Sequence, residues 1–229
     1  MIGFFVQPIE RRVDPSLVDR AKSVPVATIS DCMSRLSAGG PRLRPLHGGG
    51  VLAGPAFTVK TRPGDNLMVH KAMNMAQPGD VIVVDAGGDL TNAIIGGIMS
   101  AMAKKRGIAG FVINGAIRDV ADIAADNWPV FAAGVTHRGP YRSGPGEIGR
   151  PISLDGMVIH PGDLVVGDDD GLLSVPIDEV LEVLSGAEAK RDLEASILRD
   201  VLEGEGMNTD WVDKTLRELG CSFPDEVEK

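Results

Sequence analysis

The chain has 229 residues, of which 43% are hydrophobic and 24% charged, and its formal net charge is −9. This length and mixture are typical of a globular protein with a sizeable core, and the acidic charge disfavours nucleic acid as a partner. No stretch is long and apolar enough for a transmembrane helix, and the first residues do not resemble a secretory leader, so we expect a cytoplasmic protein with no membrane partner. The two cysteines, Cys32 and Cys221, form neither a disulfide framework nor a zinc-binding pattern.

Helices and strands are predicted to alternate through the first third of the chain. Asp14 followed by Pro15 is a favourable helix start, because Asp accepts hydrogen bonds from free N–H groups and Pro suits the first turn. This helix should continue to about Ala21. The elements expected after it are a helix over 29–38, a loop rich in Gly and Pro over 39–50, a strand over 51–61 and a helix over 66–76.

A run of β-branched residues from Val81 to Val84, followed by Asp85, predicts a strand that is buried on both faces. The turn over 86–89 comes at the carboxyl end of this strand, where open α/β sheets often bind ligands. Because strands and helices alternate, and buried strands are mixed with half-buried ones, we predict the α/β class.

The stretch from 94 to 107 predicts a helix that begins after two glycines. Gly96 and Gly97 precede an apolar helical face, and the basic residues 104–106 occupy the last turn, where cations suit the negative end of the helix dipole. Gly107 is a natural residue to end the helix. Because the first turn of a helix has free N–H groups and a positive dipole end, this start suits a small anion.

A short buried strand over 110–114 follows, and Gly115 is expected to turn the chain before Arg118 and Asp119. If the strand lies beside the helix, both charged residues come near the helix start. Arg118 could then bind a carboxylate or an enolate oxygen with its planar fork, and Asp119 could hold a hard divalent cation. Such a set suits chemistry on a 2-oxo acid. From spacing alone, a plain tight turn with a solvated Arg–Asp pair remains an alternative.

The rest of the chain predicts a long loop, a group of strands and a helical end. The loop covers 136–150, and loops of this length in compact domains are usually functional or mobile. The run Asp168 to Gly171 resembles part of a calcium loop but lacks the twelve-residue pattern, so a turn is expected. The other predicted elements are strands over 152–159, 164–166 and 172–175, helices over 178–185 and 187–203 on either side of Gly186, and a helix over 209–219.

Five short motifs follow one another along the chain: Ser30-Asp31, Gly-Pro-Ala-Phe-Thr at 54–58, Pro-Gly-Asp-Val at 78–81, Asn-Gly-Ala-Ile-Arg-Asp at 114–119 and Pro-Gly-Asp at 161–163. In this order they resemble the family that contains the regulator of ribonuclease activity A (RraA) and the class II 4-hydroxy-4-methyl-2-oxoglutarate aldolases. Each motif by itself is moderately specific for this family, and the five motifs in this order are strong evidence for the resemblance. The similarity covers about residues 25–205.

The resemblance implies a layered β/β/α swivelling-type fold, formed by a single RraA-like domain over residues 1–229. Its core would cover about 25–205, with C-terminal helices over about 178–220. The resemblance also implies assembly as a homotrimer or homohexamer, with sites between subunits. The implied cofactor is a divalent metal, Mg²⁺ or Mn²⁺, and the implied substrate is a small 2-oxo acid of the pyruvate type.

The resemblance assigns substrate binding to the helix start. The backbone N–H groups of Ile98 and Met99, directly after Gly96 and Gly97, would hold the substrate carboxylate. Asn66 is a further candidate, because in the family this loop borders the site. These assignments agree with the anion-binding character of a helix N-terminus.

The remaining roles fall on charged residues. By resemblance, Arg118 would bind the 2-oxo oxygen and stabilise the enolate, Asp119 would coordinate the metal, and Glu194 of a neighbouring subunit would complete the metal shell. The chain departs from the family at Gly97, where the family has an Asp that orients a proton-shuttling water. Loss of a positioned acid or base typically costs about 10²- to 10⁴-fold in rate.

The resemblance therefore implies a carbon–carbon lyase, either an aldolase for 4-hydroxy-4-methyl-2-oxoglutarate, an oxaloacetate decarboxylase, or both. Decarboxylation needs the same enolate and less base chemistry, so Gly97 affects it less. The alternative is a non-catalytic regulator that binds a ribonuclease or a helicase, a role for which some family members are named. A methyltransferase is not supported, since no strand leads into a glycine-rich nucleotide loop.

Overall fold

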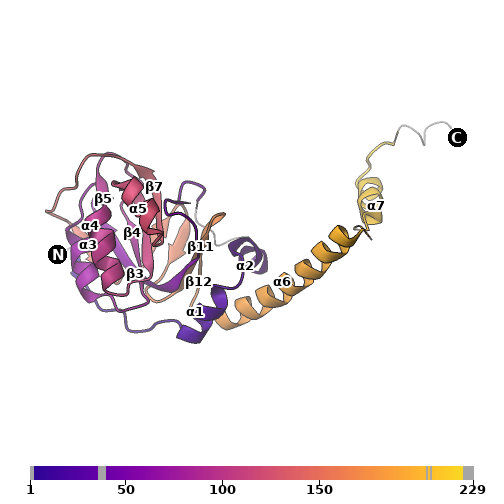
Figure 1. Ribbon diagram of the computed structural model, residues 1–229, viewed down its shortest axis with the longest axis horizontal. Coiled ribbons are helices and arrows are strands. Elements are labelled where there is room, and N and C mark those ends of the chain that lie inside the picture. Colours follow the sequence, from indigo (N-terminus) through magenta and orange to yellow (C-terminus); the bar gives the residue numbers. More distant parts are fainter. Residues whose placement is uncertain (1–2, 36–39, 205, 207, 224–229) are drawn as a thin grey trace. The chain divides into compact units, whose positions relative to one another are not determined.

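The computed structural model describes residues 3–35, 40–204, 206 and 208–223. These residues form two compact units, one that ends at Glu188 and one that begins at Ala189. The first unit contains the strands and most of the helices (Figure 1). Among the described residues, no helix combines the length and the apolar character that crossing a bilayer requires.

The strands of the first unit belong to one large sheet and a separate hairpin. In chain order they are β1 (Phe4–Val6), β2 (Arg44–Pro45), β3 (Leu52–Thr61), β4 (Val81–Asp85), β5 (Ala93–Ile95), β6 (Gly110–Ile117), β7 (Val130–Val135), β8 (Gly146–Ile148), β9 (Ile152–Leu154), β10 (Met157–Ile159), β11 (Leu164–Asp168) and β12 (Gly171–Val175). The large sheet has the order β1-β8-β3-β4-β6-β7-β2, with β5 beside β6, and β11 joining β3 to β12. Strands β3, β4, β6 and β7 run parallel, so their carboxyl ends meet at one edge.

Helices complete the fold in both units. They are α1 (Pro15–Ala21), α2 (Val26–Cys32), α3 (Leu67–Met75), α4 (Gly97–Lys105), α5 (Val120–Asp126), α6 (Val180–Glu203) and α7 (Asp210–Glu218). Helices α3, α4 and α5 contribute buried side chains to one core together with the large sheet, and Figure 1 shows them gathered around its parallel strands. The predicted α/β class is confirmed.

The central strand β4 separates two cores, as expected for a strand buried on both faces. Ile82 and Val84 pack among the helices α3 to α5, whereas Val81 and Val83 face the hairpin β9–β10. Side chains alternate along a strand, so one short apolar run serves both cores. Two strand layers and a helical layer result, which agrees with the layered fold that the resemblance implies.

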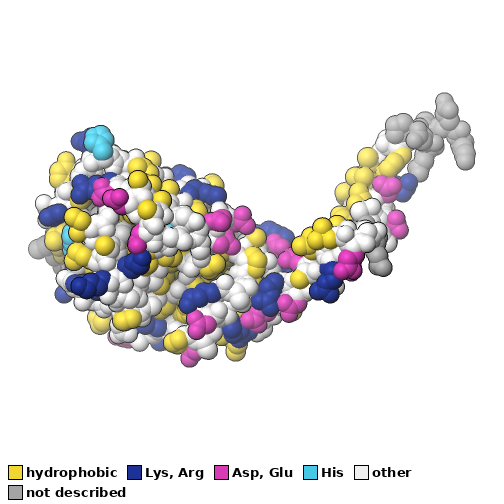
Figure 2. All heavy atoms as spheres, viewed as in Figure 1, with side chains coloured by type: hydrophobic (Ala, Val, Ile, Leu, Met, Phe, Trp, Pro, Cys, Tyr) yellow, Lys and Arg dark blue, Asp and Glu magenta, His cyan; other side chains and the backbone are white. Residues whose placement is uncertain are grey.

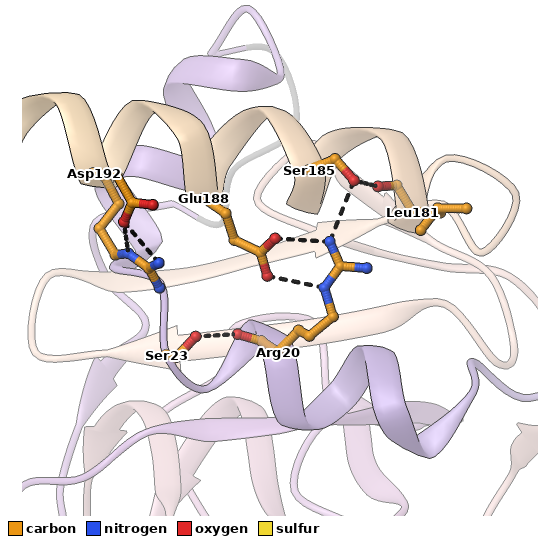
Figure 3. A network of polar contacts seen from close by, with 7 residues as sticks. Arg20, Ser23, Leu181, Ser185, Glu188 and Asp192 are labelled. Carbon is orange, nitrogen blue, oxygen red and sulfur yellow. Dashed lines mark hydrogen bonds and ion pairs between the residues drawn. The ribbon is translucent and has the colours of Figure 1, made fainter.

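A third core joins the N-terminal helices to the strands β11 and β12. Helices α1 and α2 and the first turns of α6 supply its aliphatic side chains. Arg20 of α1 forms two hydrogen bonds with Glu188, of 2.9 and 2.8 Å, and one of 3.2 Å with the Ser185 hydroxyl (Figure 3). This paired geometry fixes the start of α6 against α1.

The second unit consists of the later turns of α6 and the helix α7. Its apolar side chains are exposed, and α7 buries none of its residues. Figure 2 shows hydrophobic side chains on the surface of this part of the chain. The exposed large apolar residues are Leu193, Ile197, Leu198, Val201, Leu202, Trp211, Leu216 and Leu219.

Several predicted elements are confirmed with close boundaries. Helix α1 begins at Pro15 with Asp14 as its N-cap, whose side chain accepts a 2.8 Å hydrogen bond from the Ser16 N–H. The long strand after residue 51, the helix after residue 66 and the turn over 168–171 also form as expected. Helix capping and turn-forming residues are local signals, so the boundaries of such elements can be predicted from the sequence.

Four local predictions are wrong, and packing explains two of them. Gly115 does not turn the chain, because β6 continues through it; a Cβ there would lie 3.1 Å from the Ala86 Cβ, so the glycine permits close approach. Gly186 does not divide the helix, and α6 runs through it beside α2, with a Cβ position 3.7 Å from the Cys32 Sγ. The loop predicted over 136–150 contains the short strand β8. The strand predicted over 152–159 is instead the hairpin β9–β10, and β11 pairs with β12 and β3.

The second helix also differs from its prediction over 29–38. Helix α2 begins at Val26, directly after Pro25, whose fixed φ suits a helix start. It ends at Cys32, and residues 36–39 of the predicted helix lie outside the described residues. The missed signal was the proline, which precedes the range that hydrophobic periodicity indicated.

Candidate functional site

Arg118 and Asp119 lie where β6 ends, directly beside the start of α4. The Arg118 N–H donates a 3.1 Å hydrogen bond to the Ile95 carbonyl, which fixes the chain after the strand. Asp119 then adopts a left-handed conformation, with φ 61° and ψ 39°, which Asp tolerates better than most residues. This turn directs its carboxylate at α4, and Oδ2 accepts a 3.0 Å hydrogen bond from the Gly97 N–H.

The start of α4 is shaped by close contact with this charged pair. Gly96 is extended, and its carbonyl accepts hydrogen bonds from the Ser100 N–H at 3.1 Å and the Ser100 hydroxyl at 3.2 Å. A Cβ on Gly96 would lie 2.4 Å from the Asp119 Oδ2 and 2.9 Å from the Arg118 Cγ, so no side chain fits there. Because the Gly97 N–H is taken by Asp119, Ile98 and Met99 supply the next N–H groups of the first turn.

Asn66 supports this helix start from inside the protein. It is almost fully buried, and its amide donates hydrogen bonds to the Ile94 carbonyl at 2.9 Å and to the Met99 sulfur at 3.4 Å. Its Oδ1 is buried and has no hydrogen-bond partner among the described residues. A small cavity of about 110 Å³ lies beside it, lined among others by Asn66, His70, Gly96, Ile98, Met99, Arg118, Asp119, Pro140 and Arg142.

The structure thus brings all but one of the predicted site residues of the first unit to one cavity. Gly97 lies directly beside it, on the wall of a second cavity of about 370 Å³ between α4 and α5. The geometry agrees with the prediction that a helix start, an arginine and an acid meet at one place. The catalytic and metal-binding roles themselves remain predictions.

Sequence reasoning missed His70 and Arg142, which also line the small cavity. The Nε2 of His70 is buried, and no residue in the described part of the chain forms a hydrogen bond with it. Burial, and to a lesser extent the positive charge of Arg142, hold the pKa of His70 below its ordinary value. The spacing of His70 four residues after Asn66 on α3 was the available signal, since such residues share a helix face.

The loop that carries Pro140 and Arg142 is fastened by Asp65, which is fully buried. Its Oδ2 accepts hydrogen bonds from the N–H groups of Ser143 at 2.6 Å and Gly144 at 2.9 Å, and its Oδ1 accepts one from Leu67 at 2.9 Å. A charged acceptor with several N–H donors is a strong anchor in a buried place. The loop is therefore held against the cavity by a side chain that lies far from it in the sequence.

A divalent metal fits this site only in part. The Asp119 side chain is 42% exposed and offers carboxylate oxygens, the ligands that Mg²⁺ and Mn²⁺ prefer. Mg²⁺ often keeps several waters and needs only one or two carboxylates. Among the described residues, however, no group of three or more His, Cys, Asp or Glu converges as a ready-made metal site.

The other predicted ligand, Glu194, belongs to the second unit. There its carboxylate forms an ion pair of 2.9 Å with Lys190 on the same helix, α6. The prediction assigns it to the site of a neighbouring subunit. That assignment remains a prediction.

The α/β fold brings the helix start and the Arg–Asp pair together at the carboxyl ends of its parallel strands, where open α/β sheets often bind ligands. Comparison with known families gives a more specific result. Residues 26–173, more than half of the chain, match the RraA-like family, described as Aldolase/RraA. The chain belongs to this family.

Similar proteins agree with this placement. A protein of Halalkalibacterium halodurans with the provisional name 4-hydroxy-4-methyl-2-oxoglutarate aldolase is 44% identical over 174 residues, 76% of this chain and 83% of its own length. An uncharacterised protein of Pseudomonas syringae has a similar structure, with a TM-score of 0.76 and 28% identity, covering 84% of this chain and 95% of its own. RraAS2 of Streptomyces coelicolor, an unusual member of the RNase ES inhibitor RraA family, gives a TM-score of 0.74 at 29% identity, over 81% and 96%.

Proposed function

We propose that this chain is a divalent-metal-dependent carbon–carbon lyase that acts on pyruvate-type 2-oxo acids. Its reaction would be aldol cleavage of 4-hydroxy-4-methyl-2-oxoglutarate, decarboxylation of oxaloacetate, or both. The observation that carries the proposal is the meeting of Arg118 and Asp119 at the first turn of α4, where Arg118 Nε lies 3.7 Å from Asp119 Oδ2. The provisional aldolase name of the relative from Halalkalibacterium halodurans supports the reaction class.

In this mechanism the first turn of α4 binds the substrate carboxylate. The Gly97 N–H is already bonded to Asp119, so the N–H groups of Ile98 and Met99 are the donors left for the carboxylate. The positive end of the helix dipole strengthens this interaction. The carboxylate would thereby place the neighbouring 2-oxo group toward Arg118.

Arg118 would stabilise the negative charge that develops on the 2-oxo oxygen as the carbon–carbon bond breaks. Its planar guanidinium fork can donate two hydrogen bonds to oxygen. A bound Mg²⁺ or Mn²⁺ held by Asp119 would supply additional positive charge for the same enolate. Removal of one such donor in other enzymes costs about 10²- to 10³-fold in kcat.

Gly97 decides which reaction this chain performs best. It cannot orient a proton-shuttling water as the family Asp does, and aldol cleavage needs a base for the 4-hydroxyl proton. Loss of CO₂ from oxaloacetate needs no base at that position. We therefore expect decarboxylation to be the more robust of the two activities.

The assembly is proposed by resemblance to be a homotrimer or homohexamer, in which Glu194 reaches a neighbour's site. Light scattering coupled to size-exclusion chromatography measures this directly. A mass of about three or six chains supports shared sites. A monomer with full activity would exclude a role of Glu194 in a neighbour's site.

The test of the function is pyruvate release from oxaloacetate and from 4-hydroxy-4-methyl-2-oxoglutarate, measured with Mg²⁺, with Mn²⁺ and with a chelator. Arg118→Ala should lower kcat at least about 10²-fold on either active substrate, by the magnitude that loss of a charge-stabilising donor has elsewhere. Arg138→Ala is the matched control, because Arg138 is exposed and lines neither cavity. Metal-dependent release that Arg118→Ala abolishes supports the lyase, and release from neither substrate contradicts it.

A second candidate is the regulator that binds a ribonuclease or a helicase. It is favoured by the structural similarity to RraAS2 from the RNase ES inhibitor RraA family. A regulator does not need the enolate site, so Arg118→Ala should leave ribonuclease inhibition unchanged. Inhibition of a purified ribonuclease E-type enzyme by the wild type and by this variant alike, without pyruvate release, would favour this role.

A further inference from the structure

The second cavity lies next to the small cavity of the proposed catalytic site, and Gly97 lines only this second cavity. It has a volume of about 370 Å³, within the size range of small-molecule sites. Ile98 and Asp119 line both this cavity and the smaller one that Arg118 lines. These two shared residues place the cavities side by side at the start of α4.

Gly97 has no side chain that could extend into the larger cavity, which it lines. A Cβ there would lie 3.6 Å from the Asp119 Cβ and 3.8 Å from the Asp122 Cβ, which are ordinary contact distances. A side chain would therefore fit, and it would point between these two acids into the larger cavity. Gly97 lies at the start of a helix without a positive φ, so the backbone does not require glycine. The effect of the glycine is to keep the larger cavity free of a side chain at this position.

The lining of the larger cavity is apolar with an acidic rim. Ile98 is 77% exposed, whereas Ile123 and Trp128 form a buried floor. The charged residues of the lining are all acidic, namely Asp119, Asp122 and Asp126. Lys104 lies nearby, but its ammonium group is engaged by Asp126 at 2.6 Å.

This lining should favour substrates with an uncharged apolar group over substrates with a second carboxylate. A second carboxylate would lose its hydration and meet like charges without a cation to bind, which is unfavourable. An uncharged apolar group would instead cover the exposed Ile98 and remove its apolar surface from water, while it contacts the buried Ile123 and Trp128. An aromatic ring could also pack against the indole of Trp128.

We propose that the larger cavity receives the substituent on C4 of the substrate, and that this substituent is an uncharged alkyl or aryl group. Among the substrates of aldol cleavage, the preferred ones are then 4-hydroxy-2-oxo monocarboxylates. Cleavage breaks the C3–C4 bond, and its electron pair forms the pyruvate enolate. The 4-hydroxyl proton leaves to water, a proton from water is added at C3, and the products are pyruvate and an aldehyde or ketone that carries the apolar group.

This inference rests on the proposed function, so its first test is binding, which does not require turnover. Trp128 reports on the cavity by its fluorescence, and Trp211→Phe removes the other tryptophan, which is 58% exposed in the second unit. The probes are 2-oxo-4-phenylbutanoate and 2-oxoglutarate, neither of which has a 4-hydroxyl to cleave. The phenyl compound should change Trp128 fluorescence and bind at least about ten times more tightly. Equal or tighter binding of 2-oxoglutarate would overturn the proposal.

A second test fills the larger cavity with a side chain and compares this variant with a matched control. Ala101 is exposed and lines only the larger cavity, so Ala101→Phe should occupy it without disturbing a core. Ala125→Phe places the same side chain on an exposed position of α5 outside both cavities. Ala101→Phe should weaken binding of the phenyl compound at least about tenfold, and Ala125→Phe should not. An equal effect of both variants, or no effect of Ala101→Phe, would place the phenyl group elsewhere.

Turnover separates the two proposals. The ratio of kcat/KM for 4-hydroxy-2-oxo-4-phenylbutanoate to that for 4-hydroxy-4-methyl-2-oxoglutarate should exceed about ten in the wild type and fall in Ala101→Phe. A ratio below one would overturn the cavity assignment while it upholds the lyase. If no substrate releases pyruvate but the phenyl compound still binds tightly at Trp128, the lyase fails and the cavity assignment stands as a binding site.

Discussion

The Gly97 N–H and the Asp119 Oδ2 are joined by a 3.0 Å hydrogen bond that ties the first turn of α4 to the end of β6. One carboxylate oxygen therefore positions the helix start, while the group as a whole is still 42% exposed. The bond explains why the site depends on backbone geometry as much as on side chains. It also makes separate predictions for the structural and chemical roles of Asp119.

Asp119→Asn should separate these two roles. Asn still accepts a hydrogen bond and tolerates the left-handed conformation, so the free energy of unfolding should change by less than about 1 kcal/mol. Asp119→Ala loses both properties and should cost about 1–3 kcal/mol. Both variants should lose Mg²⁺ or Mn²⁺ affinity and at least about 10²-fold in kcat. Urea unfolding, calorimetric metal titration and pyruvate release measure the three quantities, and an active Asp119→Ala would refute the metal-binding role.

The two glycines at the start of α4 should respond differently to alanine. In Gly96→Ala the new Cβ would lie 2.4 Å from the Asp119 Oδ2, so the carboxylate and Arg118 must move. We expect at least a tenfold loss of kcat/KM, since small displacements of reacting groups are costly. Gly97→Ala meets only ordinary contacts, and its melting temperature should be unchanged or raised, because Ala is a better helix former than Gly. Equal damage by both substitutions would contradict the role assigned to the Gly96 contact.

Asp65 should prove essential for the loop that bears Arg142. Asp65→Ala leaves the N–H groups of Ser143 and Gly144 without their acceptor, which should cost about 2–4 kcal/mol of unfolding free energy. Hydrogen exchange of these two amides should accelerate, and Asp65→Asn should have a smaller effect because one oxygen remains. Asp89→Ala is a suitable control, since its side chain bonds only within an exposed turn. Unchanged exchange at Ser143 and Gly144 would show that other contacts hold the loop.

His70 should make the stability depend on pH in one direction. Its pKa is lowered in the folded protein, chiefly by burial, so the unfolded chain binds the proton more readily. Stability from this group is therefore complete above the ordinary pKa of about 6.5 and declines as the pH falls below it. Unfolding in urea at pH 7.5 and pH 5.5 should show a smaller loss on acidification for His70→Gln than for the wild type. The same substitution at the exposed His137 should leave that difference unchanged.

Local chemistry made much of the fold predictable. The Asp14–Pro15 helix start and the β-branched run at 81–84 are short-range signals, and both act through contacts within or directly around their own segment. Gly115 and Gly186 misled the prediction for the same reason. Their roles depend on Ala86 and Cys32, which approach from other parts of the chain, and no local pattern contains that information.

By itself, the sequence determined the α/β class, the family resemblance and the charged pair Arg118-Asp119 after a buried strand. Only the tertiary structure decided that Asp119 bonds to Gly97, that His70 and Arg142 share the cavity with Arg118, and that a second cavity opens at Gly97. The physical reason is that parallel strands bring together, at one sheet edge, loops that are far apart along the chain. The distances between residues on these loops depend on strand register and on how each loop is anchored. Neither can be predicted from the residue spacing within a single segment.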